Sequence, residues 1–150
     1  STSGLPKMIK KLADDDVKFN LAVSLHSAID EVRSQIMPFS KAFPLKDLRE
    51  SLEYWFEKTQ SRVTYEYVVW DGINDTKEAI EAFVKFCKYV PCKVNLIEYN
   101  PIDDGDFQQA KPDAINNYIS NLEMNDIVVN VRRSRGKDID AACGQLANKS

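Results

Sequence analysis

The chain has 150 residues, enough for one domain with a buried core, and its 43% hydrophobic and 29% charged residues are typical of a globular protein. A net charge of −3 excludes a domain whose whole surface binds nucleic acid, so any such contact has to come from a local basic patch. No apolar run approaches the roughly 20 residues of a membrane span and no signal peptide opens the chain, so we expect a cytoplasmic protein.

Amphipathic helices and short strands alternate from the first residues onward. A helix is expected over residues 5–13, and the loop before it resembles the end of a strand that the chain lacks. Apolar residues at every second position predict a strand over 17–25, after which Ser27 and Asp30 have the spacing of a short capping box. Pro44 opens a longer helix with Leu, Trp and Phe residues on one face.

The second half of the chain continues this alternation. A strand over 63–69 is broken by Asp71 and Gly72, and Asp75 is expected to cap a helix with the apolar face Ile80, Phe83, Val84 and Cys87. Pro91 ends that helix. The remaining elements are a strand over 92–99, a helix from Pro112, a strand over 127–131 and a helix over 138–147. This α/β order predicts a parallel sheet of about four strands with right-handed crossovers and flanking helices.

Each predicted strand carries polar residues at the positions that alternate with its apolar ones. They are Asn20, Ser24, His26, Thr64, Glu66, Lys93, Asn95, Asn130 and Arg132. A doubly wound sheet is buried on both faces, so its strands are apolar in both phases. Polar residues in one phase of every strand favour a barrel or half-barrel that receives a polar ligand at the C-terminal strand ends. An open sheet with one face in water is the alternative.

The three cysteines are too few and too scattered for a disulfide framework, and none forms a C-x-x-C pair, so they predict no metal site. Cys143 falls in the first turn of the last predicted helix, shortly after Arg132, Arg133, Arg135 and Lys137. The helix dipole and these cations favour a thiolate there. A small buried residue at a helix start is the alternative for Cys143, and Cys87 and Cys92 are expected in the core.

Polar residues at strand ends are candidates for ligand binding. Ser24 and His26 end one strand and Asn95 lies in another, although a single histidine or asparagine is often a structural hydrogen-bond partner. The cationic run 132–137 either clamps phosphate, which arginine binds bidentately, or is an ordinary solvated surface. The acidic stretch 103–106 lacks the spacing of a calcium loop and is expected to be a solvated turn.

Seven segments resemble, in order and spacing, the adenine-C2 RNA methyltransferases of the RlmN family. They are residues 1–4 (STSG), 21–26 (LAVSLH), 33–38 (RSQIMP), 66–68 (EYV), 72–75 (GIND), 92–101 (CKVNLIEYNP) and 135–147 (RGKDIDAACGQLA). The resemblance covers essentially the whole chain, and DIDAACGQL is its most specific part. Glu98 departs from the pattern, because proline is common in the family at that position.

The resemblance implies a radical S-adenosylmethionine (SAM) enzyme with a partial (β/α) barrel, of which residues 1–150 are the C-terminal half. The family holds a [4Fe-4S] cluster on a C-x-x-x-C-x-x-C motif, which belongs, with an RNA-binding region, to an N-terminal part that is absent here. The resemblance also implies an electron donor for the cluster, substrates in 23S rRNA and tRNA, and SAM contacts at Ser1, Ser24, Leu25, His26 and Asn95. Without cluster ligands, this chain alone is expected to be inactive.

In the family's reaction, the cysteine that matches Cys143 is first methylated by one SAM. A 5′-deoxyadenosyl radical from a second SAM abstracts hydrogen from that methyl group, and the carbon radical adds to C2 of the adenine. A second cysteine, from the absent half, resolves the adduct by forming a disulfide with Cys143. Arg132, Arg133 and Arg135 are our candidates for contacts to the RNA.

Two other functions remain open at this point. Cfr-type enzymes, which methylate C8 of the same rRNA adenine, share DIDAACGQL, but an Arg-rich run that ends in Arg-Gly, as at 132–136, is usual in the C2 enzymes. A standalone α/β module that binds a nucleotide or RNA without chemistry is the alternative from another class. A half-barrel also exposes an edge strand, so we expect a flatter sheet or self-association through that edge.

Overall fold

The computed structural model describes residues 5–15, 20–100 and 108–135. Its helices are α1 (Leu5–Asp14), α2 (Asp30–Ile36), the short 3-10 helix η2 (Pro38–Ala42), α3 (Leu45–Thr59), α4 (Lys77–Cys87) and α5 (Pro112–Met124). Its strands are β1 (Leu21–Ser24), β2 (Val63–Val69), β3 (Cys92–Asn100) and β4 (Val128–Arg135). None of the helices in this part of the chain is both long and apolar enough to cross a membrane.

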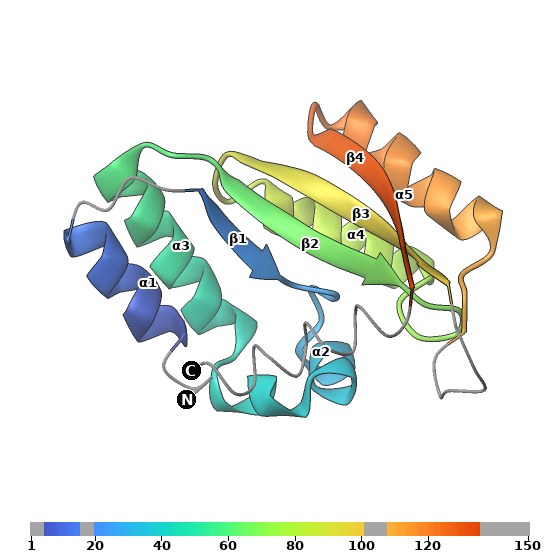
Figure 1. The fold of residues 1–150 in the computed structure, drawn as a ribbon, viewed down its shortest axis with the longest axis horizontal. Helices are drawn as coiled ribbons and strands as arrows, with labels where there is room; N and C mark the ends of the chain where they lie inside the picture. The colour runs from blue at the N-terminus through green and yellow to red at the C-terminus, as the bar shows by residue number, and fades with distance from the viewer. Residues whose placement is uncertain (1–4, 16–19, 101–107, 136–150) are drawn as a thin grey trace.

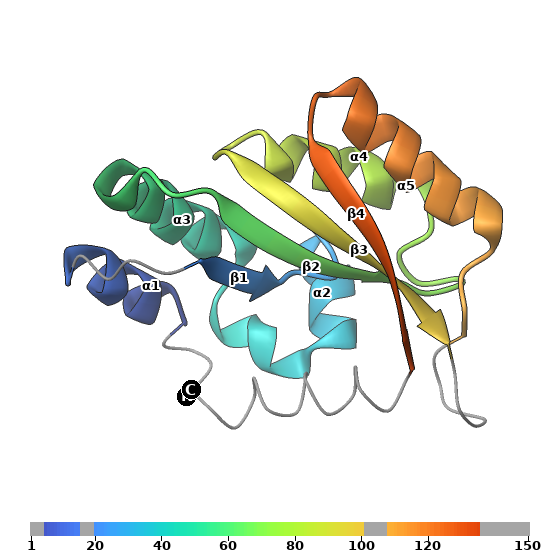
Figure 2. The ribbon, with the colours of Figure 1, turned by 45° about the horizontal axis from the view of Figure 1, so that its top comes forward.

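The four strands form one sheet in the order β1-β2-β3-β4, and every neighbouring pair is parallel. Strands in consecutive order place their connecting helices on one face when the crossovers have the usual hand. Figures 1 and 2 show α3, α4 and α5 along one side of the sheet and α2 beyond the end of β1. The predicted parallel α/β sheet with flanking helices is therefore confirmed, and its one-sided helix layer is the arrangement of a (β/α) barrel.

The main core lies between this helix layer and the sheet face that it covers. The strands contribute the alternate residues Leu21, Val23, Val63, Tyr65, Tyr67, Val69, Val94 and Leu96, all buried. The helices contribute Leu48, Leu52, Trp55, Ile80, Phe83, Ile115, Tyr118 and Leu122. The ring of Tyr67 stacks on that of Phe83 with centroids 4.0 Å apart, and its hydroxyl shares a 2.7 Å hydrogen bond with that of Tyr118. These aromatic contacts fix α4 and α5 on the sheet.

The start of α2 differs from the prediction. Ser27 does not cap the helix, because its hydroxyl oxygen accepts a hydrogen bond from the Ile29 amide (3.0 Å) in the turn that precedes it. The Asp30 carboxylate accepts instead from the Leu45 amide (2.8 Å), which ties the start of α2 to the start of α3. The predicted capping box is therefore wrong, since both side chains have partners outside the first turn of the helix.

Other element ends lie close to the prediction. Thr76, rather than Asp75, caps α4, and its hydroxyl oxygen accepts from the Ala79 amide (3.1 Å). The bounds of β2 are those predicted. Strand β4 starts at Val128 rather than Ile127 and lies at the edge of the sheet, so Val131 is exposed. The predicted strand residues 17–19 and the predicted last helix lie outside the described residues.

Candidate functional site

One row of polar residues crosses the sheet on the face opposite to the helix layer. The strand register places Ser24 beside Glu66, Glu66 beside Asn95, and Asn95 beside Asn130. Because side chains alternate along a strand, these four point away from the aromatic residues that pack on α4 and α5. Ser24, Glu66 and Asn95 are partly exposed and Asn130 is exposed. The structure therefore brings the predicted residues Ser24 and Asn95 into one row, with Glu66 between them.

The carboxylate of Glu66 is the charged centre of this polar row. Asn95 Nδ2 donates a hydrogen bond to Glu66 Oε1 (3.2 Å), and Arg132 Nη1 lies 3.9 Å from Glu66 Oε2. Glu66 Oε2 is itself buried and has no hydrogen-bond partner among the described residues. One oxygen of the carboxylate is thus held in place, and the other has hydrogen-bonding capacity that no described residue uses.

The chain turns directly after β1, and His26 adopts the left-handed conformation there, with φ of 58°. Its Nδ1 accepts a hydrogen bond from the Val68 amide (3.0 Å), so the ring proton of the neutral form is on Nε2. Burial, and to a smaller degree the charge of Arg33, lowers the pKa of His26 from 6.5 to about 3. The imidazole is therefore neutral at physiological pH.

Arg33 of α2 holds the backbone of this turn. Its Nε donates to the carbonyl of Leu25 (3.1 Å) and its Nη2 to the carbonyl of Ser24 (3.4 Å). The guanidinium is buried and lies over the ring of Phe43, 5.3 Å from the centroid. Burial lowers the pKa of Arg33 to about 10, which leaves the group charged at neutral pH. Two carbonyl dipoles and an aromatic face take the place of water around this cation.

Asn74 holds the other end of the turn together with the end of β2. Its amide nitrogen donates to the carbonyls of His26 (2.8 Å) and Val68 (2.7 Å), and its Oδ1 accepts from the Trp70 amide (2.7 Å). Asn74 is fully buried, and Gly72 supplies the positive φ of 73° in the bend between β2 and Asn74. The side chain therefore fixes two segments that are distant in sequence.

Arg33 and Asn74 together bind the carbonyls of Ser24, Leu25 and His26, yet neither was predicted as a site residue. Both lie in segments that carry the family resemblance. Their only local signals are a charged residue within a helix and an asparagine in a turn, and both are common at protein surfaces. The carbonyls that they bind in the turn after β1 lie 8 to 48 positions away in the chain, so tertiary structure sets these bonds.

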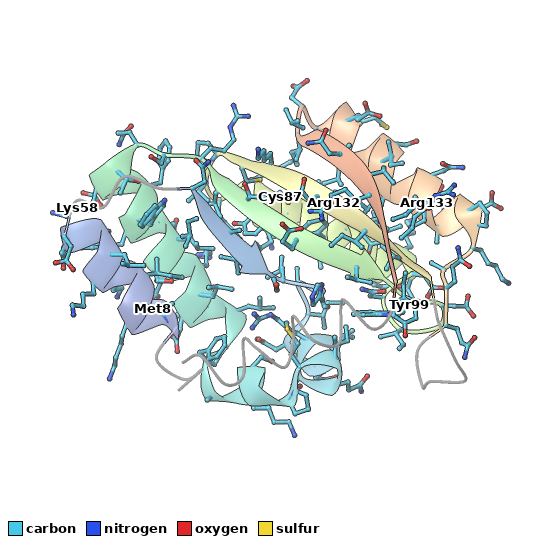
Figure 3. All side chains as sticks on the ribbon, in the orientation of Figure 1. Met8, Lys58, Cys87, Tyr99, Arg132 and Arg133 are labelled. Carbon is cyan, nitrogen blue, oxygen red and sulfur yellow. The ribbon has the colours of Figure 1, made fainter. Side chains whose placement is uncertain are left out.

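Arg132 and Arg133 point to opposite faces of β4. Arg132 shares the face of Glu66, whereas Arg133 Nε donates to Glu98 Oε2 (3.0 Å), and Figure 3 shows the two side chains diverging. Both are exposed, with 61% and 80% of the side chain accessible. Only Arg132 therefore shares the face of the polar row. Arg135 belongs to β4, but its side chain lies outside the described residues.

Ser1 and Cys143 lie outside the described residues, so their roles stay predictions. Cys87 and Cys92 are buried free thiols, as predicted for core residues. In the described ranges, no three His, Cys, Asp or Glu side chains gather where they could hold a metal ion.

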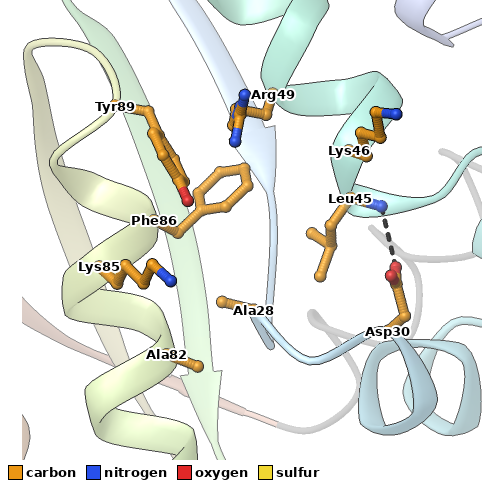
Figure 4. A pocket seen from close by; sticks show the side chains of 9 residues that line it. All are labelled: Ala28, Asp30, Leu45, Lys46, Arg49, Ala82, Lys85, Phe86 and Tyr89. Atoms are coloured by element: carbon orange, nitrogen blue, oxygen red, sulfur yellow. Dashed lines mark hydrogen bonds between the residues drawn. The ribbon is translucent and has the colours of Figure 1, made fainter.

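A cavity of about 300 Å³ lies between α3 and α4, on the helix side of the sheet (Figure 4). Lys46, Arg49 and Lys85 bring positive charge to its lining, and Asp30 brings negative charge. The Arg49 guanidinium lies over the ring of Tyr89, 4.4 Å from the centroid. None of the predicted site residues lines this cavity, so it is separate from the polar row.

Proteins of known name are similar to this chain in sequence. No model of a known protein family matches the chain. A Flavobacterium johnsoniae protein named probable dual-specificity RNA methyltransferase RlmN is 77% identical over 149 residues, which are 99% of this chain and 43% of that protein. The chain matches one part of the RlmN proteins. The RlmN protein of Salinibacter ruber is 44% identical and is matched over 99% of this chain and 41% of its own length. The chain thus spans less than half of these RlmN relatives, which is consistent with the predicted C-terminal part.

Solved structures agree with this relationship. A radical SAM methyltransferase from Sphaerobacter thermophilus superposes with a TM-score of 0.81 at 36% identity, over 95% of this chain and 42% of that one. A domain of pyruvate-formate lyase-activating enzyme from Bacteroides vulgatus gives a TM-score of 0.66 over 83% of this chain and 73% of that one. The second pair is 13% identical, so it shows a shared fold alone. The predicted resemblance to RlmN proteins and the predicted radical SAM type of fold are confirmed.

Proposed function

We propose that this chain is the C-terminal half of the core domain of a cytoplasmic RNA methyltransferase, which uses SAM to methylate C2 of adenosine in 23S rRNA and tRNA. The similarity of 99% of the chain to proteins named dual-specificity RNA methyltransferase carries the proposal. The RNA-binding region and the cluster-binding half of the barrel belong to a part of the protein outside this sequence. The chain alone is therefore inactive in methyl transfer.

The polar row and the turn after β1 fit SAM. In this proposal SAM contacts Ser1, Ser24, Leu25, His26 and Asn95. The amide of Asn95 is oriented by Glu66, and the neutral imidazole of His26 does not repel a sulfonium cation. Arg33 and Asn74 hold the backbone of the turn in place through hydrogen bonds to the carbonyls of Leu25 and His26. When bound, SAM and a [4Fe-4S] cluster reduced by an external electron donor supply the radical chemistry.

Cys143 is the residue of this chain that takes part in the chemistry. Its thiolate accepts a methyl group from SAM, with S-adenosylhomocysteine as the leaving group, and that carbon is later transferred to adenine C2. Arg132, Arg133, Arg135 and Lys137, which precede it in the sequence, favour the thiolate. The thiolate of a cysteine in the absent half then attacks the Cys143 sulfur and forms a disulfide with it. The bond between that sulfur and the transferred carbon breaks, and the carbon keeps the electron pair and takes up a proton, which releases the methylated base.

The basic end of the chain contacts RNA through Arg132, Arg133 and Arg135. Arg132 supports this role most directly, because it is exposed on the same face as the polar row. We also expect the isolated chain to self-associate through β1, because this strand pairs only with β2 among the described strands.

Replacing Cys143 in the full-length protein tests the function. Cys143→Ala is expected to reduce the transfer of labelled methyl groups from SAM to rRNA and tRNA transcripts by on the order of 10³-fold or more. Cys87→Ala is the matched control, because it removes a buried core thiol and should leave methyl transfer intact where the protein stays folded. Unimpaired Cys143→Ala protein would refute the role of this residue.

The product distinguishes the remaining alternatives. Mass spectrometry of the modified nucleosides is expected to find 2-methyladenosine, whereas 8-methyladenosine would assign the chain to the Cfr type. A binding module without chemistry is indicated if the wild-type protein binds RNA or nucleotide but transfers no methyl group. In that case the gene upstream of Ser1 should also lack three closely spaced cysteines.

A further inference from the structure

Glu66 occupies the centre of the polar row, and its only role so far is to orient the amide of Asn95 through Oε1. It pairs with Ser24 on one side and with Asn95 on the other. Neighbouring strands lie about 4.8 Å apart, so Ser24 and Asn95 are separated by two strand spacings with β2 between them. A ligand that contacts both residues at once has to cross β2 directly over Glu66.

The two oxygens of the Glu66 carboxylate have different environments. The side chain is 25% exposed, and Asn95 holds its Oε1, while Oε2 is buried and without a hydrogen-bond partner among the described residues. A buried acceptor that makes no hydrogen bond costs about 1–3 kcal/mol, and more when it is charged. A donor on a ligand would remove this cost where the groups that cover Oε2 move aside to admit it.

Arg132 determines which kind of donor suits the site. Its Nη1 lies 3.9 Å from Glu66 Oε2 and already supplies one positive charge there. A second cation, such as an ammonium group, would be repelled by the guanidinium, whereas a neutral hydroxyl would not. Acidic side chains at the ends of parallel strands hold the ribose hydroxyls of dinucleotides in the same way.

We propose that Glu66 Oε2 accepts a hydrogen bond from a ribose hydroxyl of the nucleoside that binds across the polar row. The inference rests on the proposed function, since it takes Ser24 and Asn95 as contacts of SAM. Glu66 is then a binding residue that selects ribonucleosides over their deoxy forms. It also orients the amide of Asn95, through the bond to Oε1.

The test compares three ligands in the full-length protein by isothermal titration calorimetry. The ligands are S-adenosylhomocysteine, which carries the same nucleoside as SAM without its reactive methyl group, and its 2′-deoxy and 3′-deoxy forms. Wild-type protein is expected to bind one of the deoxy forms about 10-fold or more weakly than the parent compound, because a hydrogen bond to a charged group is lost. Glu66→Ala should bind the parent compound and that deoxy form equally. Glu66→Gln, which keeps the volume of the side chain, should fall between the two.

Glu98→Ala is the matched control. Glu98 is also partly buried, with 24% of its side chain exposed, and is also paired with an arginine of β4, but it lies on the opposite face of the sheet. This variant should bind all three ligands like the wild type. Discrimination that is as strong in Glu66→Ala as in the wild type overturns the inference and leaves the proposed function intact. A wild-type protein that binds none of the three ligands overturns the proposed function and the inference with it.

Discussion

Replacing Asn74 with alanine removes three hydrogen bonds to buried backbone groups at once, those of His26, Val68 and Trp70. Each buried backbone group left without its bond costs at least about 1 kcal/mol, so we expect the free energy of unfolding to fall by about 3 kcal/mol or more. A loss of this size lowers the melting temperature of a chain of this length by about 6–12 °C.

Urea unfolding followed by tryptophan fluorescence measures this loss, because Trp70 lies within the network that Asn74 holds. Asn117→Ala is the control. Asn117 is exposed on α5, so its replacement should change stability by less than about 0.5 kcal/mol. If Asn74→Ala unfolds within about 1 kcal/mol of the wild type, the turn after β1 does not depend on this side chain and the reasoning fails.

The remaining predictions concern His26 and the arginines of β4. Because the pKa of His26 is about 3 in the fold and 6.5 in the unfolded chain, its contribution to stability is complete above pH 6.5 and is lost as the pH falls toward 3. The free energy of unfolding is measured between pH 7 and pH 4 for the wild type and for His26→Gln. As the pH falls, it should decrease more steeply in the wild type, by up to about 1.4 kcal/mol per pH unit. Equal slopes in the two proteins would contradict this. In the full-length protein, Arg132→Ala should weaken RNA binding more than Arg133→Ala and reduce the slope of log affinity against log salt by about 0.7–0.9. Equal effects of the two substitutions would show that RNA binding does not depend on which face of β4 an arginine occupies.

The elements with strong local patterns could be predicted from the sequence. The alternating residues of β2 and the proline that opens α5 gave bounds that agree with the structure. The polar phase of the strands also predicted that Ser24, Glu66, Asn95 and Asn130 share a face, because strand geometry alone determines which side chains alternate. The pairing register then places these four in one row.

Features that depend on competing partners could not be predicted. Asp75 and Thr76 are both good caps, and the choice between them depends on which oxygen reaches the Ala79 amide. Asp30 has the right type and spacing for a capping box, but its carboxylate binds a residue 15 positions away. The hydrogen bonds of Asn74 to His26 and of Arg33 to Leu25 likewise join separate elements, and no periodicity in the sequence encodes them.

The hydroxyl of Tyr118 connects α5 to the turn after β1 by way of Asn74. It shares a hydrogen bond with the Tyr67 hydroxyl inside the core and donates another to the carbonyl of Asn74, whose side chain in turn holds the carbonyl of His26. The side chains of Tyr118 and Asn74 therefore form a continuous hydrogen-bonded path from α5 to the turn after β1. Removing the phenolic oxygen of Tyr118 would break this path at its first bond.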